Sequence, residues 1–179
     1  MRYLLIGWLA LISAACSVTD KQPAVHDFGS PVSGKAQGRA SITVNAPTWL
    51  WDNRIRYRLL FASPSQVRFY GLDRWIASPP ELLEQLLASS GKAQDYVLII
   101  RLQDFEQQFD APDRARVVLR FSVDAYAADN TQKIGTQEFH LEQVTKTPDA
   151  AGAISGFTDL TQQATGKIQD WLKGLPSRQ

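Results

Sequence analysis

The stretch Ala115–Tyr126, ARVVLRFSVDAY, decides the fold, because two kinds of side chain alternate along it. Side chains of a β-strand point to opposite faces at successive positions, so this alternation predicts a strand with one buried face. The apolar face carries Val117, Leu119, Phe121, Val123 and Ala125. The other face carries Arg116, Arg120, Ser122 and Asp124.

Further strands are predicted on both sides of this one. Residues Tyr96–Leu102 are nearly all apolar, as expected of a central strand covered on both faces, and Gln103–Gln107 are polar. The turn Ala127–Asn130 leads into a strand within Lys133–Val144. Upstream, the patterns predict a short strand within 25–29, a strand at Ile42–Ala46, and a hairpin formed by Arg54–Leu59 and Gln66–Tyr70.

Two helices are predicted. Ser78 as N-cap, Pro79 in the first turn and Glu81 in a capping box begin one helix, which is expected to stop at Gly91. A second helix follows from apolar residues at three- and four-residue steps: Phe157, Leu160, Ala164, Ile168, Trp171, Leu172 and Leu175. Its apolar stripe either packs on the core or binds a partner. The fold class is α+β, a mostly antiparallel sheet with two helices packed on it.

The N-terminus has the order of a secretory signal. Arg2 precedes the apolar run Tyr3–Ile12, and small residues lead to Cys16. The run is too short to cross a bilayer, which takes about 20 residues. The small residues before Cys16 resemble the lipobox of bacterial lipoproteins, which implies a signal peptide at 1–15 and lipidation of Cys16. The alternative is a signal whose cysteine is incidental.

Residues 16–38 have the composition of a linker, rich in Ser, Gly, Pro, Gln and Lys. We therefore expect a lipidated flexible tether at 16–38 and an α+β domain at 39–179. Ser17 after the cysteine favours the outer membrane by resemblance to proteobacterial lipoproteins, with the domain on the periplasmic face.

The composition excludes several classes of protein. With 44% apolar and 21% charged residues the chain is globular, and from Cys16 onward its charges cancel, which argues against a nucleic-acid partner. His26 and His140 have no partner at metal-ligand spacing, so no metal site is predicted. Asp104 and Glu106 share a strand face but a solvated strand end explains them as well. We expect no enzymatic activity and no cofactor.

The clearest charge feature is the row formed by Arg54, Arg56 and Arg58, which share one face of a predicted strand. Together with Trp49 and Trp51 they are the candidate partner-binding residues, because Trp and Arg are enriched at interface hot spots. The alternative is an edge strand protected from aggregation by charge. Because Arg116 and Arg120 share a face elsewhere in the sheet, their cross-strand pairing with the acidic residues 104 and 106 is a further interpretation.

Three runs carry a resemblance to a known family: ITVNAPTWL at Ile42–Leu50, RIRYR at Arg54–Arg58 and FYGLDRWIASP at Phe69–Pro79. They resemble the ABC-type transport auxiliary lipoprotein family, which includes the PqiC-like intermembrane transport lipoproteins. Its members share a strand ending in a proline turn, an I-x-Y-R strand and a W-A-x-P segment leading into a helix. The last segment is one residue longer here. The match covers most of 40–127, the lipobox and the terminal helix.

The resemblance implies a non-enzymatic lipoprotein of the outer membrane. Its partners would be an MCE-domain protein and an inner-membrane permease that together move lipids or other hydrophobic compounds, and a homo-oligomer is compatible with it. Trp75 is expected to fill the space between the helix start and the sheet. One hypothesis makes the domain a docking scaffold, and the alternative makes it a periplasmic carrier that holds a lipid in its own apolar cavity.

Overall fold

The structure is a computed structural model that describes residues 21–29, 41–90, 96–129 and 132–176. Its elements confirm the predicted order of strands and helices. They are β1 (Ala24–His26), β2 (Ile42–Asn45), the 3-10 helix η1 (Thr48–Leu50), β3 (Arg54–Leu59), β4 (Val67–Trp75), α1 (Pro79–Ser89), β5 (Tyr96–Ala111), β6 (Arg114–Ala127), β7 (Lys133–Val144) and α2 (Ala150–Lys173).

Within the described residues, seven strands form one open sheet, and β5 is its centre. One edge of β5 pairs with β6, which in turn pairs with β7, in two long antiparallel ladders. The other edge is shared by two short parallel partners, because β2 pairs with Leu98–Arg101 and β3 pairs with Gln107–Phe109. The sheet is mostly antiparallel, as predicted, and its parallel ladders are the short ones.

The strand β3 lies inside the sheet and not at its edge. It pairs with β4 on one side and with β5 on the other. The interpretation of its arginine row as protection of an edge strand is therefore wrong. The physical reason is the length of β5, whose 16 residues leave room for β3 beyond the end of β2.

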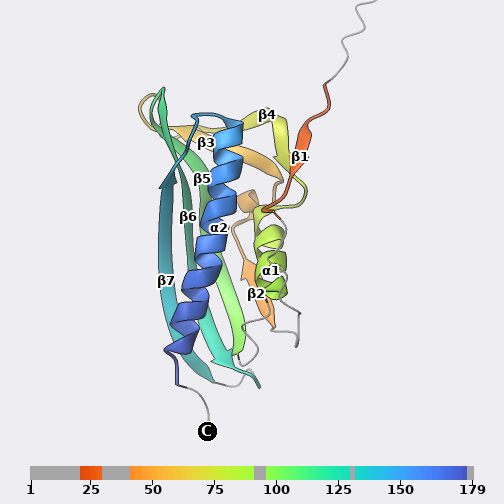
Figure 1. The fold of residues 1–179 in the computed structure, drawn as a ribbon, viewed down its shortest axis with the longest axis vertical. Helices are drawn as coiled ribbons and strands as arrows, with labels where there is room; N and C mark the ends of the chain where they lie inside the picture. The colour runs from red at the N-terminus through yellow and green to blue at the C-terminus, as the bar shows by residue number, and fades with distance from the viewer. Residues whose placement is uncertain (1–20, 30–40, 91–95, 130–131, 177–179) are drawn as a thin grey trace, which may run out of the picture.

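Both helices lie on the same side of the sheet, with α2 along the long strands and α1 beside β2 (Figure 1). The apolar stripe of α2 faces the core, since Phe157, Leu160 and Ala164 are at most 1% exposed. Val117, Leu119 and Phe121 of β6 belong to the same buried cluster. The core interpretation of the terminal helix is therefore the one that the structure supports.

Local hydrogen bonds set where each helix begins. In α1 the predicted capping box is present, with the Ser78 N–H donating to Glu81 Oε2 at 2.9 Å. In α2 the Asp149 carboxylate accepts from the Gly152 N–H at 2.8 Å. Glu84 of α1 also accepts from the Val44 N–H at 3.0 Å, which satisfies a backbone donor of β2 that lacks a strand partner.

An aromatic cluster joins four separate parts of the chain at the centre of the core. Phe105 of β5 and Phe157 of α2 stack with ring centroids 3.9 Å apart. Trp75, at the end of β4, is 1% exposed and lies edge-on to Phe157 at 6.0 Å, which confirms its predicted place in the core. Phe28 completes the cluster, 5.2 Å from Trp75 and 5.5 Å from Phe105.

Phe28 brings part of the predicted tether into the fold. β1 pairs in parallel with β4, through Ala24–Asp73 to His26–Trp75, so the predicted short first strand is confirmed. Phe28 itself is 3% exposed. Residues 24–29 thus pack on the sheet, whereas residues 16–20 and 30–38 of the predicted tether lie outside the described part of the chain.

Replacing Phe28 should therefore destabilise the whole domain. Phe28→Ala removes a buried ring from the cluster, for which we expect a loss of about 3–5 kcal/mol in the free energy of unfolding, measured by urea denaturation. The matched control is Val25→Ala, at a side chain that is 55% exposed on the same segment. A loss below about 1 kcal/mol for Phe28→Ala would show that residues 24–29 are peripheral to the core.

A pair of glycine substitutions tests the packing at the start of α2. A Cβ on Gly152 would lie 1.9 Å from the Thr147 carbonyl oxygen, so Gly152→Ala must displace backbone and should cost about 1–3 kcal/mol. A Cβ on Gly166 meets nothing within 4 Å, so Gly166→Ala should stabilise the helix by about 0.5–1 kcal/mol. Equal effects in urea denaturation would contradict the close contact at Gly152.

Candidate functional site

Four of the five candidate partner-binding residues meet where η1 joins the start of β3. Trp49 and Trp51 are 61% and 47% exposed. A guanidinium N–H of Arg56 donates to the Trp49 carbonyl oxygen, which ties η1 to β3. The Trp51 indole N–H donates to the Ala46 carbonyl oxygen at 3.2 Å. Both tryptophans therefore stand on a backbone that is held in place.

Arginines and one further aromatic residue complete this surface. The Arg54 guanidinium carbon lies 3.7 Å from the centroid of the Phe69 ring, a cation–π contact. Phe69 is opposite Arg56 in the β3–β4 register. We call Trp49, Trp51, Arg54, Arg56 and Phe69 the Trp–Arg surface. The sequence did not predict Phe69 as part of this surface. Its neighbours depend on the β3–β4 register, which contains a bulge between Arg54 and Arg56.

The two arginines of the Trp–Arg surface differ in their electrostatics. Arg54 donates from Nε to Asp52 Oδ2 at 2.6 Å, and this hydrogen bond lowers the pKa of Asp52 and raises that of Arg54. Burial is the main influence on Arg56 and lowers its pKa. Arg54 therefore carries an ion partner at the surface, whereas Arg56 is partly shielded and is held by a backbone carbonyl.

Arg58 does not join the Trp–Arg surface. It points from β3 to β5 and forms a bidentate ion pair with Glu106, at 3.0 Å from Nε to Oε1 and 3.1 Å from Nη2 to Oε2. Glu106 is 6% exposed, and Gln108 donates to the same carboxylate at 2.9 Å. Arg58 thus has a structural partner, and its predicted role at an interface stays a prediction.

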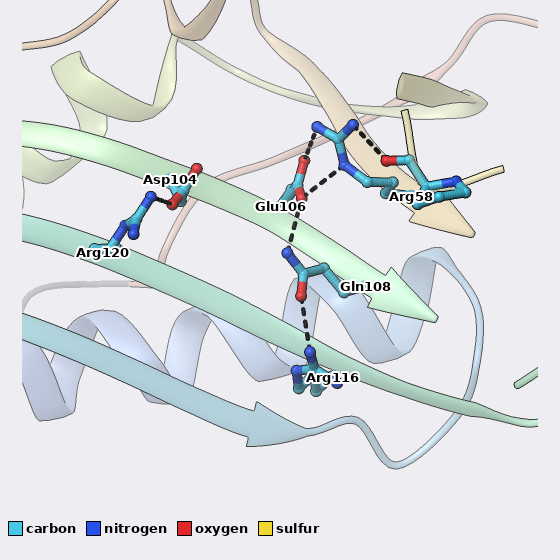
Figure 2. A network of polar contacts seen from close by, with 7 residues as sticks. Arg58, Asp104, Glu106, Gln108, Arg116 and Arg120 are labelled. Atoms are coloured by element: carbon cyan, nitrogen blue, oxygen red, sulfur yellow. Dashed lines mark hydrogen bonds and ion pairs between the residues drawn. The ribbon is translucent and has the colours of Figure 1, made fainter. Parts of the chain in front are cut away.

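Glu106 begins a polar network on the sheet face that points away from the buried cluster (Figure 2). Arg116 of β6 donates to Gln108 Oε1 at 2.9 Å and pairs with Asp110 and Glu142. Arg120 pairs with Asp104 at 2.5 Å. The predicted cross-strand pairing is therefore present between Arg120 and Asp104, whereas Glu106 pairs with Arg58 and not with Arg116. Both carboxylates are held by guanidinium groups, which leaves them poorly suited to acid–base work.

The most buried charge of this face is Asp124, which is 0% exposed. Its carboxylate lies 2.6 Å from Arg101 Nη2 and 2.7 Å from Lys133 Nζ, and it accepts from the Thr136 hydroxyl at 2.7 Å. Burial alone would raise the pKa of Asp124, but the hydrogen bonds from Lys133, Thr136 and Arg101 lower it to about 2. Three strands are joined at this carboxylate, because Arg101, Asp124 and Lys133 come from β5, β6 and β7.

The two histidines have local partners. His26 Nε2 lies 2.9 Å from Asp73 Oδ1, and His140 Nε2 lies 2.9 Å from Glu142 Oε1. Among the described residues no group of three His, Cys, Asp or Glu side chains could hold a metal ion. The helices of the described part are also not long and apolar enough to cross a membrane. Cys16 and Gly91 lie outside the described residues.

Comparison with solved structures shows that the fold is shared. A crystal structure of a Xanthomonas campestris protein of family DUF330 aligns with a TM-score of 0.64 and 17% identity, over 84% of this chain and 92% of that chain. An uncharacterized protein aligns with a TM-score of 0.63 and 15% identity, over 84% and 99% of the two chains. A candidate lipoprotein of Caulobacter crescentus CB15 reaches a TM-score of 0.36 over 53% and 80%, which does not show a shared fold.

At these identities the likeness defines the fold class and leaves the function open. No family model matches the chain. No curated protein matches it either.

The dependence of stability on pH tests whether the charge of Asp124 stabilises the sheet. Its pKa in the folded state, about 2, lies below the value of about 3.9 in an unfolded chain, so the ionised carboxylate stabilises the fold above about pH 4 and this contribution is lost between about pH 4 and 2. We expect Asp124→Asn to lower the free energy of unfolding by about 1–2 kcal/mol at pH 7, measured by urea denaturation. This is less than the pKa difference alone would give, because the partners Arg101 and Lys133 are exposed and solvent screens their charges.

The difference between the wild type and Asp124→Asn should shrink as the pH falls towards 2. The control is Asp170→Asn, since the Asp170 side chain is 76% exposed beside Lys173 and should contribute little at any pH. A cost for Asp124→Asn that does not change between pH 7 and pH 2.5 would show that the charge of Asp124 is not what stabilises the sheet.

Proposed function

We propose that the protein is a lipoprotein anchored through Cys16 to the periplasmic face of the outer membrane, where it acts as a docking subunit of an MCE/ABC-type system for intermembrane lipid transport. It works without catalysis, by contact with an MCE-domain protein and the permease of the same system. The family resemblance of the sequence supports the transport system, and the lipobox supports the anchor. The observation that carries the docking role is the Trp–Arg surface.

The Trp–Arg surface has the composition of an interface. Tryptophan and arginine dominate protein–protein hot spots, because a large rigid ring and a planar guanidinium lose little conformational freedom on binding. Here two tryptophans are exposed by about half or more, and hydrogen bonds to Ala46 and Arg56 hold their backbone and rings in place. A surface that is organised before binding costs less entropy when the partner docks.

The core argues for docking over lipid carriage. A carrier needs an apolar chamber, and the natural place for one is between the helices and the sheet. In this protein that space holds the stacked rings of Phe105 and Phe157 and the buried indole of Trp75. The hollows that described residues line include ones of about 240, 380 and 440 Å³. These three are open to solvent, and none of them is lined by Trp75, Phe105 or Phe157, so none is a chamber between the helices and the sheet.

Removing one tryptophan should weaken partner binding without unfolding the domain. Trp49→Ala keeps the carbonyl oxygen that Arg56 contacts, and it removes a ring that is 61% exposed. We expect at least about a tenfold loss of the MCE-domain protein that co-purifies with the full-length lipoprotein in mild detergent, measured by quantitative mass spectrometry. The control is Phe61→Ala, whose ring is 47% exposed in the β3–β4 turn.

The same preparation tests the anchor, since the mass of the N-terminal peptide reports acylation of Cys16. A wild-type protein without acyl chains, or one that recovers no MCE-domain protein, would contradict the proposed function. If Trp49→Ala recovers as much MCE-domain protein as the wild type does, the assigned surface is contradicted, but the proposed function is not.

A further inference from the structure

The fold leaves a short connection between the proposed anchor and the sheet. β1 begins at Ala24, eight residues after Cys16. An extended chain spans at most about 3.6 Å per residue, so Ala24 lies within about 29 Å of the anchored cysteine. Because β1 pairs with β4 and Phe28 is buried, the chain reaches the sheet no more than eight residues after Cys16. This step rests on the proposed function, through the acylation of Cys16.

The sheet edge next to the tether presents apolar side chains to solvent. Val25 of β1 is opposite Arg74 of β4, and Leu72 lines the same hollow as Arg74. Ile76 continues the ladder, since its N–H donates to the His26 carbonyl oxygen at 2.8 Å. Val25, Leu72 and Ile76 are 55%, 53% and 65% exposed. Trp75 and Phe28, by contrast, point into the core.

Basic groups accompany these apolar side chains. Lys21 and Arg74 are exposed, and both line a hollow of about 440 Å³ together with Leu72 and Gly71. Of the nearby acids, Asp73 is paired with His26 at 2.9 Å, and Asp27 accepts from the Gly29 N–H at 2.8 Å. Arg54, which is opposite Arg74 in the register, already has Asp52 as its partner. Lys21 and Arg74 therefore supply the cationic groups that this face offers to an anion.

We propose that Val25, Leu72, Arg74 and Ile76, with Lys21, form a lipid face that rests on the phospholipid surface carrying the anchor. Exposed aliphatic side chains among basic residues are the composition of proteins that lie at the headgroup–acyl boundary. The aliphatic groups enter this boundary, and the cations meet lipid phosphates. The short tether keeps the lipid face at the membrane, where a weak contact suffices because the anchor raises its local concentration.

Contact with lipid fixes the orientation of the domain. β1 and β4 lie at the end of the molecule where α2 begins, and the C-terminal end of α2 lies at the opposite end (Figure 1). The C-terminal ends of β6 and α2, at the bottom of Figure 1, are therefore held away from the bilayer. The Trp–Arg surface adjoins the lipid face through the Arg54–Arg74 pair of the register, so a docked partner would approach close to the membrane.

Depth-dependent quenching tests this inference on the full-length acylated protein. A thiol-reactive fluorophore is attached in Leu72→Cys and, as the control, in Lys173→Cys, whose native side chain is 75% exposed at the far end of α2. Acylated Cys16 has no free thiol and stays unlabelled. The proteins are reconstituted into vesicles of phosphatidylethanolamine and phosphatidylglycerol that contain a nitroxide-labelled phospholipid. We expect severalfold stronger quenching at position 72 than at position 173.

A second arm tests the cations. Vesicles of phosphatidylcholine carry no net charge, so quenching at position 72 should fall there, and Arg74→Ser should reduce it in the anionic vesicles. Equal, weak quenching at both positions in a protein with acylated Cys16 would overturn the lipid face and leave the proposed function standing. Absence of the acyl chains would overturn the proposed function itself, which separates the two failures.

Discussion

The contact on which the rest of the structure depends is the aromatic cluster of Phe28, Trp75, Phe105 and Phe157. Each ring comes from a different part of the chain, and together they fasten the N-terminal segment, β4, β5 and α2 to one another. Aromatic rings bury large apolar areas and gain further energy from edge-on and stacked contacts. The sheet can carry a polar outer face because this cluster secures its inner face.

That polar outer face is built from paired charges. Arginines of β3, β5 and β6 are matched by Glu106, Asp104, Asp110 and Asp124 in the ion pairs that the structure describes. Such pairing gives the sheet a rigid surface. The Trp–Arg surface contrasts with it, because two large aromatic side chains, Trp49 and Trp51, are exposed there. This contrast is the physical basis for our proposal that the protein acts by contact.

Sequence patterns predicted the elements well and their arrangement poorly. Alternation in β6 and the stripe of α2 each reflect burial on one face, which is a local property of the chain, and both predictions are confirmed. The sequence could not predict which strands pair with β5, because its parallel pairing with β2 and β3 depends on strand lengths and on register. Phe28 was placed in a linker because a single aromatic residue among Ser, Gly and Pro shows no periodicity. Arg58 was grouped with Arg54 and Arg56 because they share a face, although its partner Glu106 lies 48 positions away.

Phe28 and Phe157 belong to one cluster although they are far apart in the sequence, and this separation has a consequence for folding kinetics. β1 pairs with a strand about 50 positions later. The rings of Trp75 and Phe105, which Phe28 contacts, also contact Phe157, which lies farther still along the chain. Domains dominated by distant contacts fold slowly, because loop-closure entropy is lost before the contacts form. A nascent or truncated chain that lacks the final helix has no complete core to collapse on. Such a domain is therefore committed to its native state late, once almost all of its residues are present.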